Sequence, residues 1–93
     1  MEVLNGTRVD GFARSVTRQL RRAGIDVVYF GSADERDVDS TRIIVRRGDS
    51  TAAAPVRDAL GGGRIVVDPD PRLLLDITVL LGHDLSPARQ GAP

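Results

Sequence analysis

The chain has 93 residues, of which 41% are apolar, and its 13 basic and 13 acidic side chains cancel to zero net charge. A chain of this length forms a single domain that buries about 60–65% of its unfolded surface, so a deep catalytic cavity would compete with its own core. The neutral charge argues against general binding to nucleic acid, and the complete lack of cysteine excludes disulfides, thiolate metal sites and thiol nucleophiles.

The first half of the chain predicts a strand, a helix and a second strand. Val3-Leu4 forms a strand before a turn signal, and Asp10 is the expected N-cap of a helix that begins near residue 11. Apolar residues at helical spacing form one buried stripe, which consists of Ala13, Val16, Leu20 and Ala23. Gly24 ends this helix in a left-handed conformation, and the β-rich segment 25–30 predicts the second strand.

The second half repeats this order after an acidic loop over residues 31–40. Its expected elements are a strand at 41–46, a helix from about 51 to 60, a strand at 64–67 and a last strand at 75–81. Pro55 removes a backbone donor, which predicts that the helix starts late or bends there. The glycines at 61–63 end the helix, and the domain is expected to cover residues 2–82, with a flexible tail at 83–93.

The two halves repeat with an offset of 40 residues, because Val56 follows Val16 and Leu60 follows Leu20 by that distance. The same offset matches Val3 with Ile43, Leu4 with Ile44, Ala13 with Ala53, Ile25 with Ile65, and Val27 with Val67. Each half is therefore a βαβ unit, and right-handed crossovers place both helices on one face of a common sheet. The predicted class is α+β: a ferredoxin-like two-layer sandwich with a five-stranded, mostly antiparallel sheet.

Two segments have the spacing of a ligand site without its chemistry. Residues 6–11 have the glycine spacing of a phosphate loop, but Phe12 and Ala13 occupy the positions where Lys and Ser or Thr would hold phosphate and magnesium. The loop at 34–39 carries four carboxylates, but the sixth and twelfth positions of a calcium loop counted from Asp37 are arginine and glycine. We expect no metal and no cofactor.

The sequence contains no convincing arrangement of catalytic side chains. His83 is the only histidine, and its nearest hydroxyl, Ser86, lies in the expected tail, which cannot hold a nucleophile and base in register. Asp68 and Asp70 are separated by one proline in a loop, which is typical of a stiff turn rather than of paired catalytic carboxylates. The sequence therefore predicts a protein without enzymatic activity.

The sheet itself is the best candidate for a binding surface. If Val3, Val27, Tyr29, Ile43, Ile65 and Val67 face the helices, strand alternation leaves five apolar residues on the opposite face: Leu4, Val28, Phe30, Ile44 and Val66. A contiguous apolar patch on a monomer usually marks an interaction surface. The scarcity of aromatic residues favours a protein partner or self-association over a glycan, and the alternative is that the loop at 31–40 or the tail covers this face.

Several stretches resemble the C-terminal domain of LytR/CpsA/Psr-type cell-envelope proteins. The resemblance covers residues 2–82, and its most specific parts are the opening Val3-Leu4-Asn5-Gly6-Thr7 and the closing segment Asp76-Ile77-Thr78-Val79-Leu80-Leu81-Gly82. Between them, Ala23-Gly24-Ile25-Asp26-Val27-Val28 and Thr41-Arg42-Ile43-Ile44-Val45-Arg46 also match. In that family a separate domain transfers glycopolymers to peptidoglycan, so the resemblance transfers no catalytic residue to this chain.

The resemblance implies an accessory module on the extracytoplasmic side of a bacterial membrane, within a larger anchored protein. Its expected partner is a cell-wall component or a protein, with a structural or oligomerisation role as the alternative. Neither nucleic acid nor the membrane is an expected partner of this segment. Strand-like residues from Glu2 onward leave no room for a signal peptide, so an exported parent would carry this chain as one part.

Overall fold

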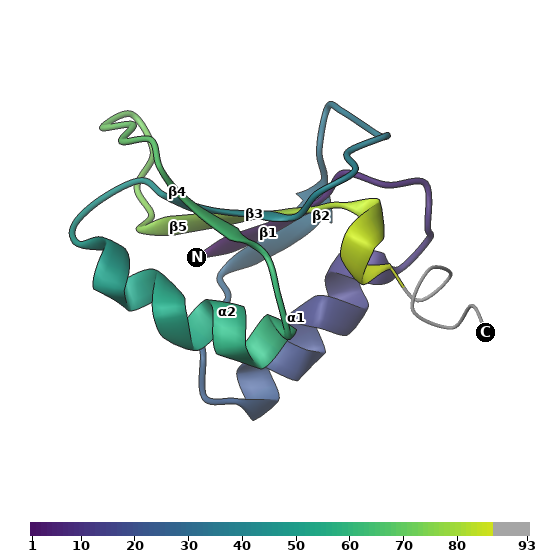
Figure 1. Ribbon diagram of the computed structural model, residues 1–93, viewed down its shortest axis with the longest axis horizontal. Coiled ribbons are helices and arrows are strands. Elements are labelled where there is room, and N and C mark those ends of the chain that lie inside the picture. Colours follow the sequence, from purple (N-terminus) through teal and green to yellow (C-terminus); the bar gives the residue numbers. More distant parts are fainter. Residues whose placement is uncertain (87–93) are drawn as a thin grey trace.

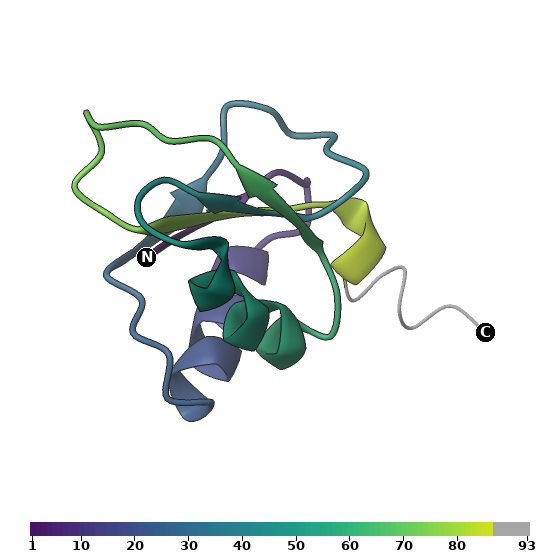
Figure 2. The ribbon, with the colours of Figure 1, turned by 60° about the vertical axis from the view of Figure 1, so that its left-hand side comes forward.

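The structure, a computed structural model, describes residues 1–86 and has two layers, a five-stranded sheet and two helices on one of its faces (Figure 1). The view in Figure 2 shows the same separation of the two layers. The elements in chain order are β1 (Glu2–Asn5), α1 (Phe12–Arg22), β2 (Tyr29–Ser32), β3 (Arg42–Val45), α2 (Ala54–Leu60), β4 (Arg64–Val67) and β5 (Ile77–Leu81), with 3₁₀ turns at Ser50–Ala53 and His83–Leu85.

The strand order across the sheet is β2-β1-β5-β3-β4. β1 pairs in parallel with β2 and β5, β3 pairs in parallel with β4, and the contact between β3 and β5 is antiparallel. The predicted α+β class, with five strands and both helices on one face, is confirmed, but the expected mostly antiparallel, ferredoxin-like pairing is wrong. β5 takes the central position, so each βαβ half keeps its own two strands side by side instead of interleaving with the other half.

The internal repeat is arranged about β5. Val79, in the middle of β5, pairs with Val3 on one side and with Ile43 on the other, and these two residues are related by the offset of 40. The same offset relates buried residues of the two helical segments, namely Ala13 and Ala53, Val16 and Val56, and Leu20 and Leu60. The predicted helical stripe is therefore confirmed, apart from the exposed Ala23 at the C-cap of α1.

The offset fails in the second strand of each half. Phe30 pairs with Val3 as Ile65 pairs with Ile43, so these strands are related by 35 residues (65 minus 30). Residues 25–28, expected to form a strand, are an irregular segment that precedes β2. Because β2 starts later than predicted, the alternation of its side chains between the two faces is shifted as well.

The two helices begin in different ways. Gly11, with φ of 76°, occupies the N-cap of α1, and no side chain caps this helix, so the expectation that Asp10 is the N-cap is wrong. Before α2, the side chain of Asp49 accepts a hydrogen bond from the backbone N–H of Thr51. A 3₁₀ turn follows, and Pro55 lies in the first turn of α2, where a missing N–H costs little. The predicted late start of this helix is confirmed.

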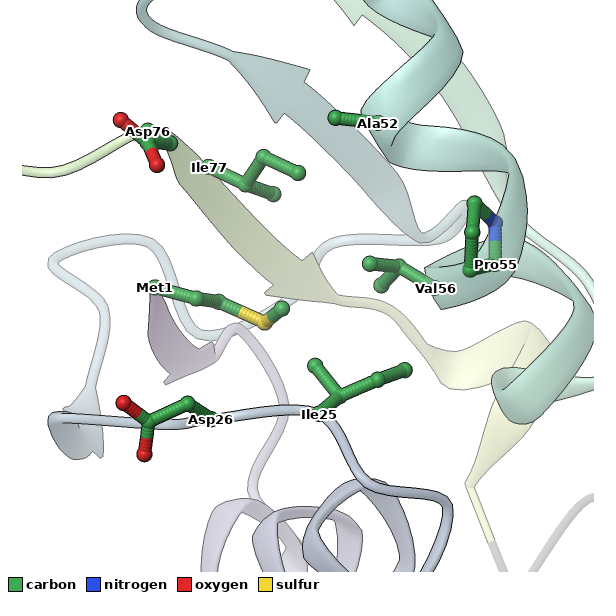
Figure 3. Close-up of a pocket in the computed structure, with 8 residues that line it drawn as sticks. All are labelled: Met1, Ile25, Asp26, Ala52, Pro55, Val56, Asp76 and Ile77. Carbon is green, nitrogen blue, oxygen red and sulfur yellow. The ribbon is translucent and has the colours of Figure 1, made fainter.

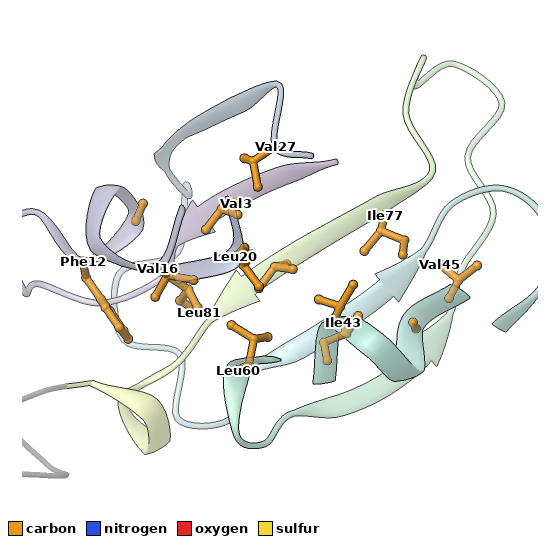
Figure 4. Packing of buried hydrophobic residues seen from close by; sticks show 14 residues of the cluster. Val3, Phe12, Val16, Leu20, Val27, Ile43, Val45, Leu60, Ile77 and Leu81 are labelled. Atoms are coloured by element: carbon orange, nitrogen blue, oxygen red, sulfur yellow. The ribbon is translucent and has the colours of Figure 1, made fainter. Parts of the chain in front are cut away.

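The core lies between the sheet and the helices (Figure 4). Leu20 of α1 and Val3 and Val79 of the sheet are completely buried. The labelled residues of this cluster are Val3, Phe12, Val16, Leu20, Val27, Ile43, Val45, Leu60, Ile77 and Leu81. Both halves of the repeat thus contribute to one continuous core.

The chain after β5 continues as part of the domain. Asp84 accepts hydrogen bonds at its Oδ1 from the backbone N–H of Thr41 at 3.0 Å and from the Thr41 hydroxyl at 2.7 Å. Leu85 packs against the core, and Ser86 is buried. Residues 83–86 of the expected tail are therefore folded, and the remainder, residues 87–93, lies outside the described residues.

Candidate interaction surface

The face of the sheet turned away from the helices is here called the outer face. Because paired residues of neighbouring strands share a face, the strand register assigns its members. They are Glu2, Leu4, Tyr29, Gly31, Arg42, Ile44, Arg64, Val66, Thr78 and Leu80. Loops 33–41 and 68–76 rise beside opposite ends of the sheet on this same side (Figure 1), so the outer face lies between two loops.

The predicted binding residues divide into two groups. Leu4, Ile44 and Val66 lie on the outer face as expected, but Ile44 is buried there, with an exposure of 9%. Phe30 pairs with Val3 and packs against the core, so the expectation that it faces away from the helices is wrong. Val28 precedes β2 and is 69% exposed, with its N–H bonded to the Met1 carbonyl. That the outer face binds a partner stays a prediction.

Tyr29 is the aromatic residue of the outer face, because the late start of β2 exchanges the expected positions of Tyr29 and Phe30. Its hydroxyl would lie 2.5 Å from a Cβ added at Gly31, so the phenol ring packs beside this glycine. Gly31 pairs with Leu4, and Leu4 pairs with Leu80. Tyr29, at 55% exposure, and the two half-buried leucines therefore form an accessible apolar area over β2, β1 and β5.

A chain of polar side chains crosses the outer face beside this apolar area. The Thr78 hydroxyl donates to Glu2 Oε2 at 2.7 Å and accepts from Arg46 Nε at 3.3 Å. Arg46 Nη1 donates to the Asp68 carbonyl at 3.1 Å and to Asp68 Oδ2 at 3.2 Å. The outer face is therefore not one continuous apolar patch. Strand alternation in the sequence placed Thr78 and Arg46 on this side and was the signal that could have revealed the interruption.

Gly31, Leu4 and Leu80 begin a row of paired residues that crosses the outer face, and two arginines end this row. Arg42 pairs with Leu80 on one side and with Arg64 on the other. Both arginines are exposed, and within residues 1–86 neither side chain has a hydrogen bond or an ion pair. Like charges opposite each other on neighbouring strands are unfavourable, and the guanidinium groups suit bidentate contact with carboxylate or phosphate. This row thus changes from apolar to cationic across the sheet.

Backbone hydrogen bonds of Val38, which is buried, hold loop 33–41 against the end of the sheet. The Val38 N–H donates to the Gly6 carbonyl at 2.8 Å, and the Val38 carbonyl accepts from the His83 N–H at 2.8 Å. In the same loop, Asp37 lies 3.4 Å from Arg8 Nε and 3.8 Å from the His83 ring. The hydrogen bond from Arg8 holds the pKa of the Asp37 carboxyl below its ordinary value, and His83 acts in the same direction.

A pocket of about 270 Å³ lies on the helix side of the sheet, between the amino-terminal ends of α2 and β5 (Figure 3). The apolar side chains of Met1, Ile25 and Val56 converge on it, whereas the carboxyl groups of Asp26 and Asp76 lie at its rim. Both aspartates are exposed to solvent. The pocket therefore offers mainly apolar contact, with two solvent-exposed carboxyl groups at its rim.

A second cleft, of about 230 Å³, lies where β1 and β2 end beside the first turn of α1. Asn5 lines it, but the Asn5 side chain accepts from the Thr7 N–H and hydroxyl and donates to the Val9 carbonyl. The segment with phosphate-loop spacing is therefore a turn held together by its own side chains.

The other groups considered from the sequence have structural partners. Asp68 pairs with Arg46, and Asp70 pairs with Arg72 at 3.0 Å. The hydrogen bond from Arg72 holds the pKa of the Asp70 carboxyl below its ordinary value. Among the described residues, no three His, Asp or Glu side chains come together as a metal site, and no helix is long and apolar enough to cross a membrane.

Residues 1–85 match the family model described as LytR cell envelope-related transcriptional attenuator. The chain is also similar to the cell wall biosynthesis protein LcpA of Corynebacterium glutamicum, with 32% identity over 68 residues. That alignment covers 73% of this chain and 13% of the relative, so the chain corresponds to a small part of that longer protein. No solved structure matches the chain.

Proposed function

Because this chain belongs to the LytR_C family of cell-envelope proteins, we propose that it is a non-catalytic accessory module that binds an envelope partner through the outer face. Its place would be the extracytoplasmic side of a bacterial membrane, within a larger anchored protein. The partner would be a cell-wall component or a protein that presents anionic groups. The similarity to a cell wall biosynthesis protein supports this setting.

The observation that carries the proposal is the row of outer-face residues that ends in arginine. Leu4 and Leu80 supply accessible apolar contact beside Tyr29, and Arg42 follows Leu80 on the next strand. An anionic group bound there would relieve the repulsion between Arg42 and Arg64. The loops at either end of the sheet limit the direction from which a partner can approach (Figure 2).

Transcriptional attenuation, the term in the family description, does not lead us to propose DNA binding. The 13 arginines are balanced by 13 acidic residues, and phosphate neutralisation supplies much of the free energy with which proteins bind DNA. The acidic loop at 33–41 rises on the same side as the outer-face arginines and would repel a polyanion as large as a duplex.

Sedimentation with purified sacculi tests this function. We expect the domain to be retained, and Arg42→Glu, which reverses one exposed charge, to lose most of the retention. Arg18→Glu is the matched control. Arg18 is exposed on α1, in the opposite layer, and its substitution changes the net charge by the same amount as Arg42→Glu. Equal retention of the two variants would exclude the outer face. Dimerisation that rises with concentration, without retention, would identify a structural or oligomerisation domain instead.

The absence of catalysis is tested separately. The purified domain is expected to show no hydrolase activity and no glycopolymer transfer. Turnover that is lost on changing His83 or Asp68 would contradict the non-catalytic assignment.

A further inference from the structure

β4 is an edge strand with one side of its backbone unpaired. Its other side is bonded to β3, since the N–H groups of Arg64 and Asp68 donate to carbonyls of the β3 segment at 2.9 and 3.0 Å. A parallel ladder alternates, so the N–H and C=O groups of Ile65 and Val67 point away from the sheet. Unpaired edges of this kind are templates for another strand.

The sequence of this edge is complementary to itself. In an antiparallel pairing of two copies centred on Val66, Arg64 of one copy lies opposite Asp68 of the other, and Ile65 lies opposite Val67. The outward backbone groups belong to Ile65 and Val67, so these residues would exchange the hydrogen bonds of two antiparallel pairs. Charge, apolar contact and backbone pattern therefore agree on a single register.

We propose that the domain associates with a second copy of itself by antiparallel pairing of β4, which joins the two sheets into one. Arg64 has no ion pair within residues 1–86, and the side chain of Asp68 is 69% exposed although it contacts Arg46, so both are accessible to the partner. The pairing would also cover Val67, which is 58% exposed.

The structure around β4 leaves this edge open. After β4 the chain turns toward β3, because the Asp70 N–H donates to the Arg46 carbonyl at 3.2 Å. Pro69 has no N–H and therefore ends the new ladder shortly after β4. The opposite edge strand, β2, contains no charged residue that could specify a register. These features favour β4 over β2 as the interface.

A charge exchange tests the pairing. Sedimentation of the unmodified domain between about 10 µM and about 1 mM should show dimers that increase with concentration. Arg64→Asp and Asp68→Arg should each weaken dimerisation at least about tenfold, because each places like charges opposite each other twice. An equal mixture of the two variants should form heterodimers, since each charge then meets its opposite. A monomer at about 1 mM, or a mixture that stays monomeric, would overturn the proposal.

Cross-linking tests the register itself. The chain has no cysteine, and the two Val66 residues would form a non-hydrogen-bonded pair with Cα atoms about 4.5 Å apart, within the range of a disulfide. The Val66→Cys variant should therefore form a covalent dimer on mild oxidation. Tyr29→Cys, on the outer face of the other edge strand, is the matched control. Equal cross-linking of both variants would overturn the register.

The inference can be tested apart from partner binding by the outer face, although Arg64 takes part in both. Arg42 lies opposite Arg64 but outside the β4 pairing, so Arg42→Ala, which adds no competing carboxylate, should leave the dimer intact while it reduces retention by sacculi. Loss of the dimer in Arg42→Ala, with a normal thermal melt, would show that the interface lies on the outer face and would overturn the proposal.

Discussion

Leu20→Ala is expected to lower the free energy of unfolding by about 3–4 kcal/mol. Leu20 is completely buried between α1 and the sheet, and the truncation removes three carbons, whose transfer from water contributes about 2.4 kcal/mol. The remainder comes from a cavity that the paired strands beneath it cannot fill, because buried leucine-to-alanine changes cost about 2–5 kcal/mol in total. The loss is a large fraction of the roughly 5–14 kcal/mol typical of a domain of this length.

Urea unfolding followed by far-ultraviolet circular dichroism measures this loss. Fluorescence is less suitable, because the chain has no tryptophan and its single tyrosine is exposed. Leu74→Ala is the matched control: it removes the same atoms from a side chain that is 90% exposed, and it should cost less than about 0.5 kcal/mol. The slope of the transition should stay constant in both variants if each unfolds in one step.

Two results would refute the reasoning. A loss below about 0.5 kcal/mol for Leu20→Ala would mean that α1 does not pack on the sheet through this residue. An equally large loss for Leu74→Ala would mean that the loop after β4 is buried against another surface. The first result concerns the core, and the second concerns the exposed loop, so the two failures can be told apart.

Three further predictions follow from local contacts. Gly82→Ala should cost about 1–3 kcal/mol in the same urea assay, because a Cβ there would lie 2.7–2.8 Å from backbone atoms of Ser40 and Thr41; unchanged stability would contradict this packing. Thr17→Val should leave stability unchanged or raise it by about 1 kcal/mol, because the buried hydroxyl has no hydrogen-bond partner in the described residues. A loss of stability in this variant would show that the hydroxyl has a partner. In an NMR titration the carboxyl of Asp37 should have a pKa below 3.8 and return toward that value in Arg8→Ala. Its stabilising effect is therefore present above the ordinary pKa and is lost as the pH falls through the lowered value; an unchanged titration in Arg8→Ala would exclude this pair.

Two glycines within the most specific sequence stretches show what a motif leaves unexplained. Gly6 and Gly82 are visible in the sequence, but neither has a positive φ that would account for it. In the fold, a Cβ at Gly6 would lie 2.7 Å from the Leu81 carbonyl and from Val38, and Gly82 faces the backbone of residues 40–41. Both therefore permit close approach of segments that are distant in the chain.

The candidate surface was predicted in part. Leu4, Ile44 and Val66 were placed on the correct face, because alternation within a strand depends on each strand alone. Phe30 and Tyr29 were exchanged, because the residue at which β2 begins depends on its pairing with β1. The repulsive pair Arg42 and Arg64 depends on the register of β3 with β4 and was therefore not predicted.

The sequence by itself determined the local features of this protein. The helical stripes, the late start at Pro55 and the turn at Gly24 follow from residues within a few positions of one another, whose geometry is dictated by the backbone. Tertiary structure alone decided that β5 lies between β1 and β3, and hence which strands are parallel and which edge is open. The physical reason is that an apolar strand can pair with several neighbours, and only the joint packing of both helices and all five strands selects one arrangement.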